Sequence, residues 1–195
     1  RLSKGLAQRT GRPVRLKTAA VVGSESSALA HQLDALPPDY RADVVVIVVG
    51  GNDVTHMIPP STSTAHLETA IRRVRAEGAT VVVGTCPDLG TLRPVPQPLR
   101  ALMARMSRHL AAAQTRTAER AGAVPVDLRR AVGHHFHAEP DDMFSLDRFH
   151  PSAAGYRRTA EALLPAVVAA LGRRVDPAPA DDSVSDWRVA GGSRG

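Results

Sequence analysis

The sequence predicts an α/β fold in which a parallel sheet lies between helices on both of its faces. Residues 44–49 are six consecutive β-branched residues, a pattern typical of a strand buried on both faces in a parallel sheet. Further strand patterns alternate with helical ones through the body of the chain, which indicates βαβ units. We expect one domain over residues 1–173, with no internal repeat. Residues 174–195 have the composition of a disordered tail.

The individual elements follow from apolar spacing and from the glycines and prolines that interrupt it. Helices are expected at residues 1–11, 24–36, 63–77, 99–121 and 152–171, and strands at residues 13–22, 44–49, 79–85 and 123–128. Ser24 or Ser26 is expected to cap the second helix, and residues 129–146 are expected to be irregular. The expected core residues are Leu67, Ile71 and Val74 in the helix over 63–77, and Leu99, Leu102, Met106 and Leu110 in the helix over 99–121.

The composition narrows the range of partners. The net charge is +6, but only Lys4 and Lys17 among the 25 basic residues are lysines, and the arginines are spread along the chain. No basic run is interleaved with aromatic residues, so we predict no nucleic-acid partner. No apolar stretch approaches the roughly 20 residues that span a bilayer, so stable membrane insertion is not expected. No signal peptide is visible, which slightly favours the cytoplasm, and the oligomeric state stays open.

Polar residues that could take part in binding or catalysis follow the strand at 44–49. In open α/β sheets, ligands bind beyond the carboxyl ends of the strands. Here Gly50 and Gly51 allow a sharp turn, and Asn52 offers a side-chain amide suited to stabilising an oxyanion. A plain turn is the simpler interpretation of Gly-Gly-Asn-Asp, since these are standard turn residues.

A second motif, Asp147-x-x-His150, precedes the last helix. An imidazole is the usual general base for activating a hydroxyl group, and a carboxylate at its Nδ1 orients the ring. The spacing of three residues allows Asp147 to bend round to His150, and Pro151 holds His150 at the start of the helix. By itself the motif is a common coincidence.

Together, Gly23 after one expected strand, Gly-Gly-Asn-Asp after the next and Asp-x-x-His-Pro before the last helix resemble three of the four sequence blocks of the SGNH hydrolase (GDSL-like lipase/esterase) family. The resemblance covers about residues 1–171. It implies a three-layer flavodoxin-like sandwich, a site without metal or cofactor, and a small acyl ester or acylated carbohydrate as substrate. It also implies that Gly23 and Asn52 donate to the oxyanion, that His150 is the general base oriented by Asp147, and that Asp53 supports the turn.

The family's first block, a strand ending in Gly-Asp-Ser with the nucleophilic serine, is absent from the 195 residues. We therefore expect the sequence to be truncated at its N-terminus, lacking the first strand of the sheet. The possible substitutes are Ser3, Ser24, Ser26 and Ser145. Ser24 and Ser26 follow a strand, but capping suits them better, Ser3 has no preceding strand, and Ser145 lies too close to the base in sequence.

Other candidate side chains have ordinary interpretations. The histidines His134, His135 and His137 lack a second ligand cluster, so a solvated loop is favoured over a metal site. Pocket positions are conceivable for His56, Cys86 and Asp88, although Cys86 suits the role of a small buried residue.

Two function classes remain after a nucleotide or phosphate binder is set aside, because no phosphate-binding glycine loop occurs. The leading hypothesis is a serine ester hydrolase whose full-length form carries the serine. The alternative is a non-catalytic module that binds a ligand or partner without turning it over.

Overall fold

The computed structural model describes residues 2–172, which form an α/β domain around a parallel sheet. The sheet contains β1 (Val44–Val48), β2 (Thr80–Gly84) and β3 (Val124–Val126), in that spatial order and all parallel. This confirms the predicted fold class. The tail expected at 174–195 lies outside the described residues. Within residues 2–172, no helix is both long and apolar enough to cross a bilayer.

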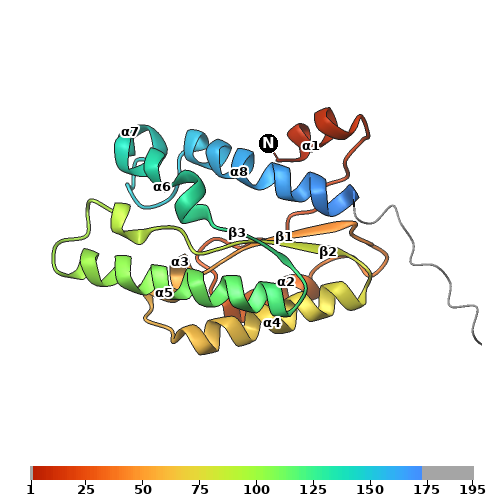
Figure 1. Cartoon of the computed structure of the whole chain (residues 1–195), viewed down its shortest axis with the longest axis horizontal. Helices are drawn as coiled ribbons and strands as arrows, with labels where there is room; N and C mark the ends of the chain where they lie inside the picture. The colour runs from red at the N-terminus through yellow and green to blue at the C-terminus, as the bar shows by residue number, and fades with distance from the viewer. Residues whose placement is uncertain (1, 173–195) are drawn as a thin grey trace, which may run out of the picture.

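Helices cover both faces of the sheet (Figure 1). One layer contains α1 (Leu2–Thr10), α6 (Leu128–Ala138), α7 (Pro140–Met143) and α8 (Ala153–Gly172). The other contains α2 (Leu29–Asp34), α4 (Pro60–Ala76) and α5 (Leu99–Arg120). The short helix α3 (Gly51–Thr55) follows β1, and η1 (Ser26–Ala28) and η2 (Leu89–Thr91) are 3-10 turns.

Buried aliphatic side chains fill both interfaces between the sheet and the helices. The predicted stripe Leu67, Ile71 and Val74 of α4 is buried against one face. On the other face, Val82 packs with Leu163 and Val167 of α8. The strand that is fully buried on both faces is β2, because Val81, Val82 and Val83 all have 0% exposure.

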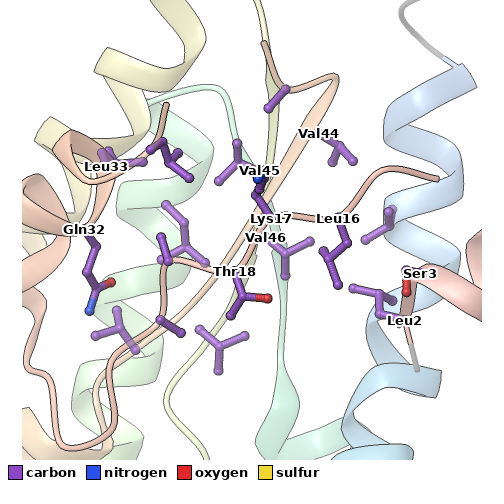
Figure 2. Close-up of a pocket in the computed structure, with 18 of the residues that line it drawn as sticks. Leu2, Ser3, Leu16, Lys17, Thr18, Gln32, Leu33, Val44, Val45 and Val46 are labelled. Carbon is purple, nitrogen blue, oxygen red and sulfur yellow. The ribbon is translucent and has the colours of Figure 1, made fainter. Parts of the chain in front are cut away.

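The prediction that residues 44–49 are buried on both faces is wrong for β1. Residues 44–46 are half-buried and Val48 is 49% exposed. The reason is that β1, in the described part of the chain, pairs with β2 on one side only. Beyond its other edge lies a cavity of about 1300 Å³ (Figure 2).

The strand predicted over residues 13–22 is also wrong, since the structure assigns no strand there. This segment borders the same cavity as β1, and no backbone pairing joins the two. Three of its apolar side chains are open to solvent, with Leu16, Val21 and Val22 exposed by 60%, 62% and 86%, whereas Val14 packs against the core. The cavity therefore separates two apolar walls, β1 and residues 13–22.

Three further expectations were wrong. Residues 129–146 are not irregular but contain α6 and α7, and Asp127 caps α6 by accepting a bond from the Arg130 N–H at 2.9 Å. The face of α5 includes polar residues: Ser107 and Gln114 are buried, whereas Leu99 and Leu102 are 48% and 42% exposed. Neither η1 nor α2 has a side-chain cap, so the capping role expected of Ser24 or Ser26 is not observed.

The buried Gln114 of α5 joins the carboxyl ends of two strands. Its Nε2 donates to the Val49 carbonyl at 3.0 Å, and its Oε1 accepts from the Cys86 N–H at 2.7 Å. The chain turns sharply beside it at Gly50, where φ is +121° and a Cβ atom would lie 2.9 Å from Gln114 Nε2. Only glycine fits this turn without displacing its neighbours.

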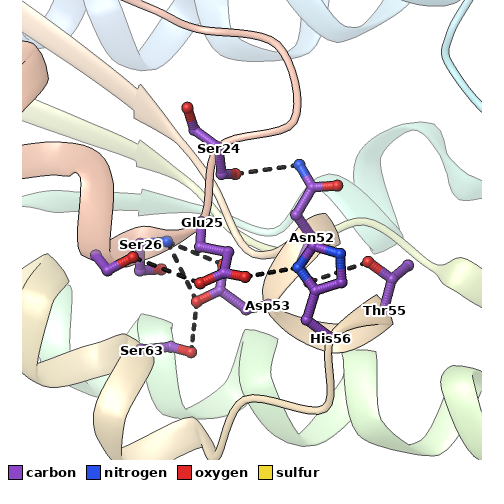
Figure 3. Close-up of polar contacts among 9 residues, drawn as sticks. Ser24, Glu25, Ser26, Asn52, Asp53, Thr55, His56 and Ser63 are labelled. Atoms are coloured by element: carbon purple, nitrogen blue, oxygen red, sulfur yellow. Dashed lines mark hydrogen bonds and ion pairs between the residues drawn. The ribbon is translucent and has the colours of Figure 1, made fainter.

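The buried carboxylate of Asp53 joins three segments (Figure 3). Asp53 is 1% exposed and belongs to α3. It accepts a bond from the Ser26 N–H at 3.1 Å and one from the Ser63 hydroxyl at 2.6 Å. These contacts attach the start of η1 and the first turns of α4 to α3.

We predict that Asp53→Ala lowers the free energy of unfolding by about 2–4 kcal/mol, because the Ser26 N–H and the Ser63 hydroxyl lose their buried acceptor. Chemical denaturation measures the effect. Asp34→Ala is the matched control: Asp34 pairs with Arg73 at the surface, and its loss is expected to cost less than about 1 kcal/mol. Equal losses in the two variants would show that the Asp53 contacts contribute little.

Candidate active site

The predicted pair Asp147 and His150 is joined by a hydrogen bond. His150 Nδ1 lies 2.7 Å from Asp147 Oδ2. An ionised carboxylate only accepts, so the proton of this bond belongs to Nδ1, and Nε2 of the neutral ring keeps its lone pair. The two side chains are 51% and 46% exposed, so solvent reaches both partners.

Asp147 is held by more than the imidazole. Its Oδ1 accepts bonds from the Ser145 hydroxyl at 2.6 Å, the Phe149 N–H at 2.9 Å and the His150 N–H at 3.0 Å. The Ser145 hydroxyl, followed by the His150 ring and the two backbone donors, holds the pKa of the Asp147 carboxyl well below its usual range. The carboxylate therefore stays charged under the conditions in which a histidine base works.

Asn52 lies at the start of α3, directly beyond the turn that ends β1. Its Nδ2 donates to the Ser24 carbonyl at 3.1 Å (Figure 3). An amide nitrogen carries two hydrogens, so this bond leaves a second N–H available. The same contact holds the segment after Gly23 next to Asn52.

Gly23 lies in the turn before η1 with φ of +81°, a conformation that favours glycine. It is exposed, and the adjoining Ser24 N–H closes the turn on the Val21 carbonyl at 3.3 Å. Gly23, Asn52 and His150 all line the cavity beside β1. Residues from three distant sequence blocks therefore border one cavity, and their roles in catalysis stay a prediction.

One pair near the site was not predicted. Glu25 Oε1 and His56 Nδ1 lie 2.6 Å apart and join the segment after Gly23 to the residue that follows α3 (Figure 3). The partners are 31 residues apart. No local sequence pattern signals such a pairing, although the sequence makes His56 a candidate pocket residue.

The remaining candidate serines occupy different surroundings. Ser3 belongs to α1 and Ser24 to the turn beside Asn52, and both line the cavity. Ser26 is fully buried, and its hydroxyl oxygen has no partner among the described residues. Ser145 is bound to the carboxylate oxygen of Asp147 that does not face the imidazole.

Cys86 and the histidine cluster have no evident place in the chemistry. Burial, with the nearby carboxylates of Asp53 and Asp88, raises the pKa of the Cys86 thiol, which keeps it protonated. His134 stacks on His135, and His137 Nε2 lies 3.6 Å from Asp88 Oδ2. In the part of the chain that the structure describes, no three histidine, cysteine or carboxylate side chains are grouped to hold a metal ion.

The sequence is similar to that of a known esterase. The chain is 44% identical over 179 residues to the GDSL-like esterase Rv1075c of Mycobacterium tuberculosis (strain ATCC 25618 / H37Rv). The aligned region covers 90% of this chain and 56% of that relative. The chain thus spans little more than half of that protein's length.

Solved structures share the fold at lower identity. The lipase/acylhydrolase from Enterococcus faecalis superimposes with a TM-score of 0.67 and 22% identity, over 88% of this chain and 85% of that one. The α/β hydrolase LAE5 from the metagenome of Lake Arreo, Spain, gives a TM-score of 0.69 and 22% identity, over 88% and 79% of the two chains. Residues 1–158 match the sequence profile of a known family, and the chain belongs to this family, the GDSL-like lipase/acylhydrolases.

Proposed function

We propose that this protein is an ester hydrolase that transfers an acyl group from an alcohol to a serine and then to water. The observation that carries the proposal is the 2.7 Å bond between His150 Nδ1 and Asp147 Oδ2 beside a cavity that Asn52 and Gly23 also line. Family membership and the esterase named among its relatives support the same reaction class.

The proposed chemistry assigns one task to each residue. His150 Nε2 accepts the serine proton as the serine oxygen attacks the ester carbonyl, and it later gives that proton to the leaving alcohol. A water molecule then attacks the acyl-serine through the same base, which releases the acid and restores the serine. Asp147 orients the ring and stabilises the imidazolium, while the free Asn52 N–H and the Gly23 N–H stabilise the tetrahedral oxyanion.

The attacking serine, in this proposal, is carried by a strand that occupies the cavity between β1 and residues 13–22. The backbone of β1 supports this. The Thr80 N–H donates to the Asp43 carbonyl, so residue 43 faces β2. Since successive residues of a parallel strand alternate between its two edges, the backbone groups of Val44, Val46 and Val48 face the cavity. A parallel strand there would satisfy them and would end beside Asn52.

A non-catalytic binding module is the second candidate, favoured by the absence of Gly-Asp-Ser from the 195 residues. Such a module would keep the cavity but would not turn over an ester. The two candidates differ in a single measurement, hydrolysis by the chain extended upstream of Arg1.

We predict that this extended chain hydrolyses short acyl esters such as p-nitrophenyl acetate. His150→Ala is expected to reduce kcat/KM by roughly 100- to 10,000-fold, because the base that takes the serine proton is lost. His66→Ala, an exposed histidine on α4, is the matched control and should retain activity. Undiminished turnover in His150→Ala would reject the assignment of the base, and no turnover in the parent chain would favour the binding module.

Hydrogen exchange tests the proposed strand separately. In the 195-residue chain, we predict that the amides of Val44, Val46 and Val48 exchange readily, whereas those of Val45 and Ile47, which face β2, are protected. In the extended chain all five amides should be protected. Val45 and Ile47 are the internal control in both samples. Rapid exchange at Val46 in the extended chain would contradict occupation of the cavity by a strand.

A further inference from the structure

Ser145 uses all of its polar groups within the loop that carries Asp147 and His150. Its hydroxyl donates to Asp147 Oδ1 at 2.6 Å. Its N–H donates to the His150 carbonyl at 2.8 Å, and its carbonyl accepts from the Arg148 N–H at 2.8 Å. One residue therefore contacts the proposed base, the carboxylate that orients it and the turn between them.

The two oxygens of the Asp147 carboxylate have different hydrogen-bond partners. Oδ1 receives the Ser145 hydroxyl and two backbone N–H groups, while Oδ2 binds the imidazole. Three donors on one oxygen fix the rotation of the carboxylate plane, and so direct the other oxygen at Nδ1. Ser145 is the side-chain donor of the three, and among the described contacts of Asp147, His150 is the only titratable partner.

Burial does not fix the orientation of the Asp147 carboxylate, because the Asp147 and His150 side chains are 51% and 46% exposed. Exposed ion pairs are weak and their side chains mobile unless the geometry is held by other contacts. The loop supplies such contacts: Phe144 and Pro151 form an antiparallel bridge at its base, and Ser145 is half-buried just inside it. The Ser145 hydroxyl thus donates to Asp147 from the residue next to this bridge.

We propose that Ser145 is a positioning residue, which holds the Asp147 carboxylate so that Oδ2 keeps the His150 ring in the orientation needed for catalysis. This inference rests on the proposed function for its catalytic consequence, but its structural part concerns the loop alone. It gives Ser145 a different task from the nucleophile considered from the sequence. The hydroxyl acts on the base through Asp147 and takes part in no bond making.

The structural part is tested by NMR on the 195-residue chain, where no turnover is needed. In Ser145→Ala, the pKa of the Asp147 carboxyl should rise toward its usual range, because the anion loses its strongest donor. The His150 Nδ1 proton signal should shift or broaden as the ring loosens. Ser145→Thr keeps the hydroxyl and should restore both signals. Ser27→Ala, which removes a hydroxyl 3.5 Å from the Glu25 carboxylate, is the matched control and should change neither.

Catalysis is tested in the extended chain. We expect Ser145→Ala to lower kcat by roughly 10- to 100-fold with KM nearly unchanged, as for small misplacements of a catalytic group, and Ser145→Thr to recover most of that loss. Unchanged Asp147 titration and Nδ1 signal in Ser145→Ala would overturn the proposal. So would an unchanged kcat in a chain whose turnover depends on His150. If the NMR changes occur but His150→Ala leaves hydrolysis intact, the proposed function fails and the structural role of Ser145 stands.

Discussion

The arrangement of the candidate site depends on one buried polar side chain, that of Asp53. A carboxylate removed from water is costly unless donors surround it, and here the Ser26 N–H and the Ser63 hydroxyl provide them. Because these donors come from η1 and α4, the segment after Gly23 and the start of α4 cannot move independently of α3. Asn52 precedes Asp53 in the same helical turn, so the distance between the two proposed oxyanion donors is set by a contact beneath the site.

A second constraint acts at the edge of β1. Backbone N–H and C=O groups in an apolar setting need partners, and those of Val44, Val46 and Val48 face a cavity rather than a neighbouring strand. Residues 13–22 form the opposite wall without pairing with β1, so they are not a strand although Val14, Val21 and Val22 favour one. Hydrophobic pattern alone does not make a strand, because a strand also needs an edge within hydrogen-bonding distance.

Features that depend on local pattern could be predicted from the sequence, and features that depend on distant partners could not. The core stripe of α4 and the close approach of Asp147 to His150 follow from spacings of three or four residues. The buried face of α5 could not be found from hydrophobicity, because Gln114 is buried to serve Val49 and Cys86, which lie far away in sequence. The pairing of Glu25 with His56 could not be predicted for the same reason, because the two residues are far apart in sequence. The helix α6 could have been predicted, because Asp127 is a capping signal and the buried residues Leu128, Val132 and Phe136 recur every four residues.

The two halves of the candidate site are stabilised in different ways. Gly23 and Asn52 are tied to a buried network, so their positions are secured by the free energy of folding itself. Asp147 and His150 are exposed, and water competes for each of their bonds. Their geometry therefore depends on how many donors converge on one carboxylate oxygen, not on burial. Changes in the loop around Ser145 can then alter the proposed base while leaving the core intact, whereas changes around Asp53 cannot alter the proposed oxyanion donors without also weakening the fold.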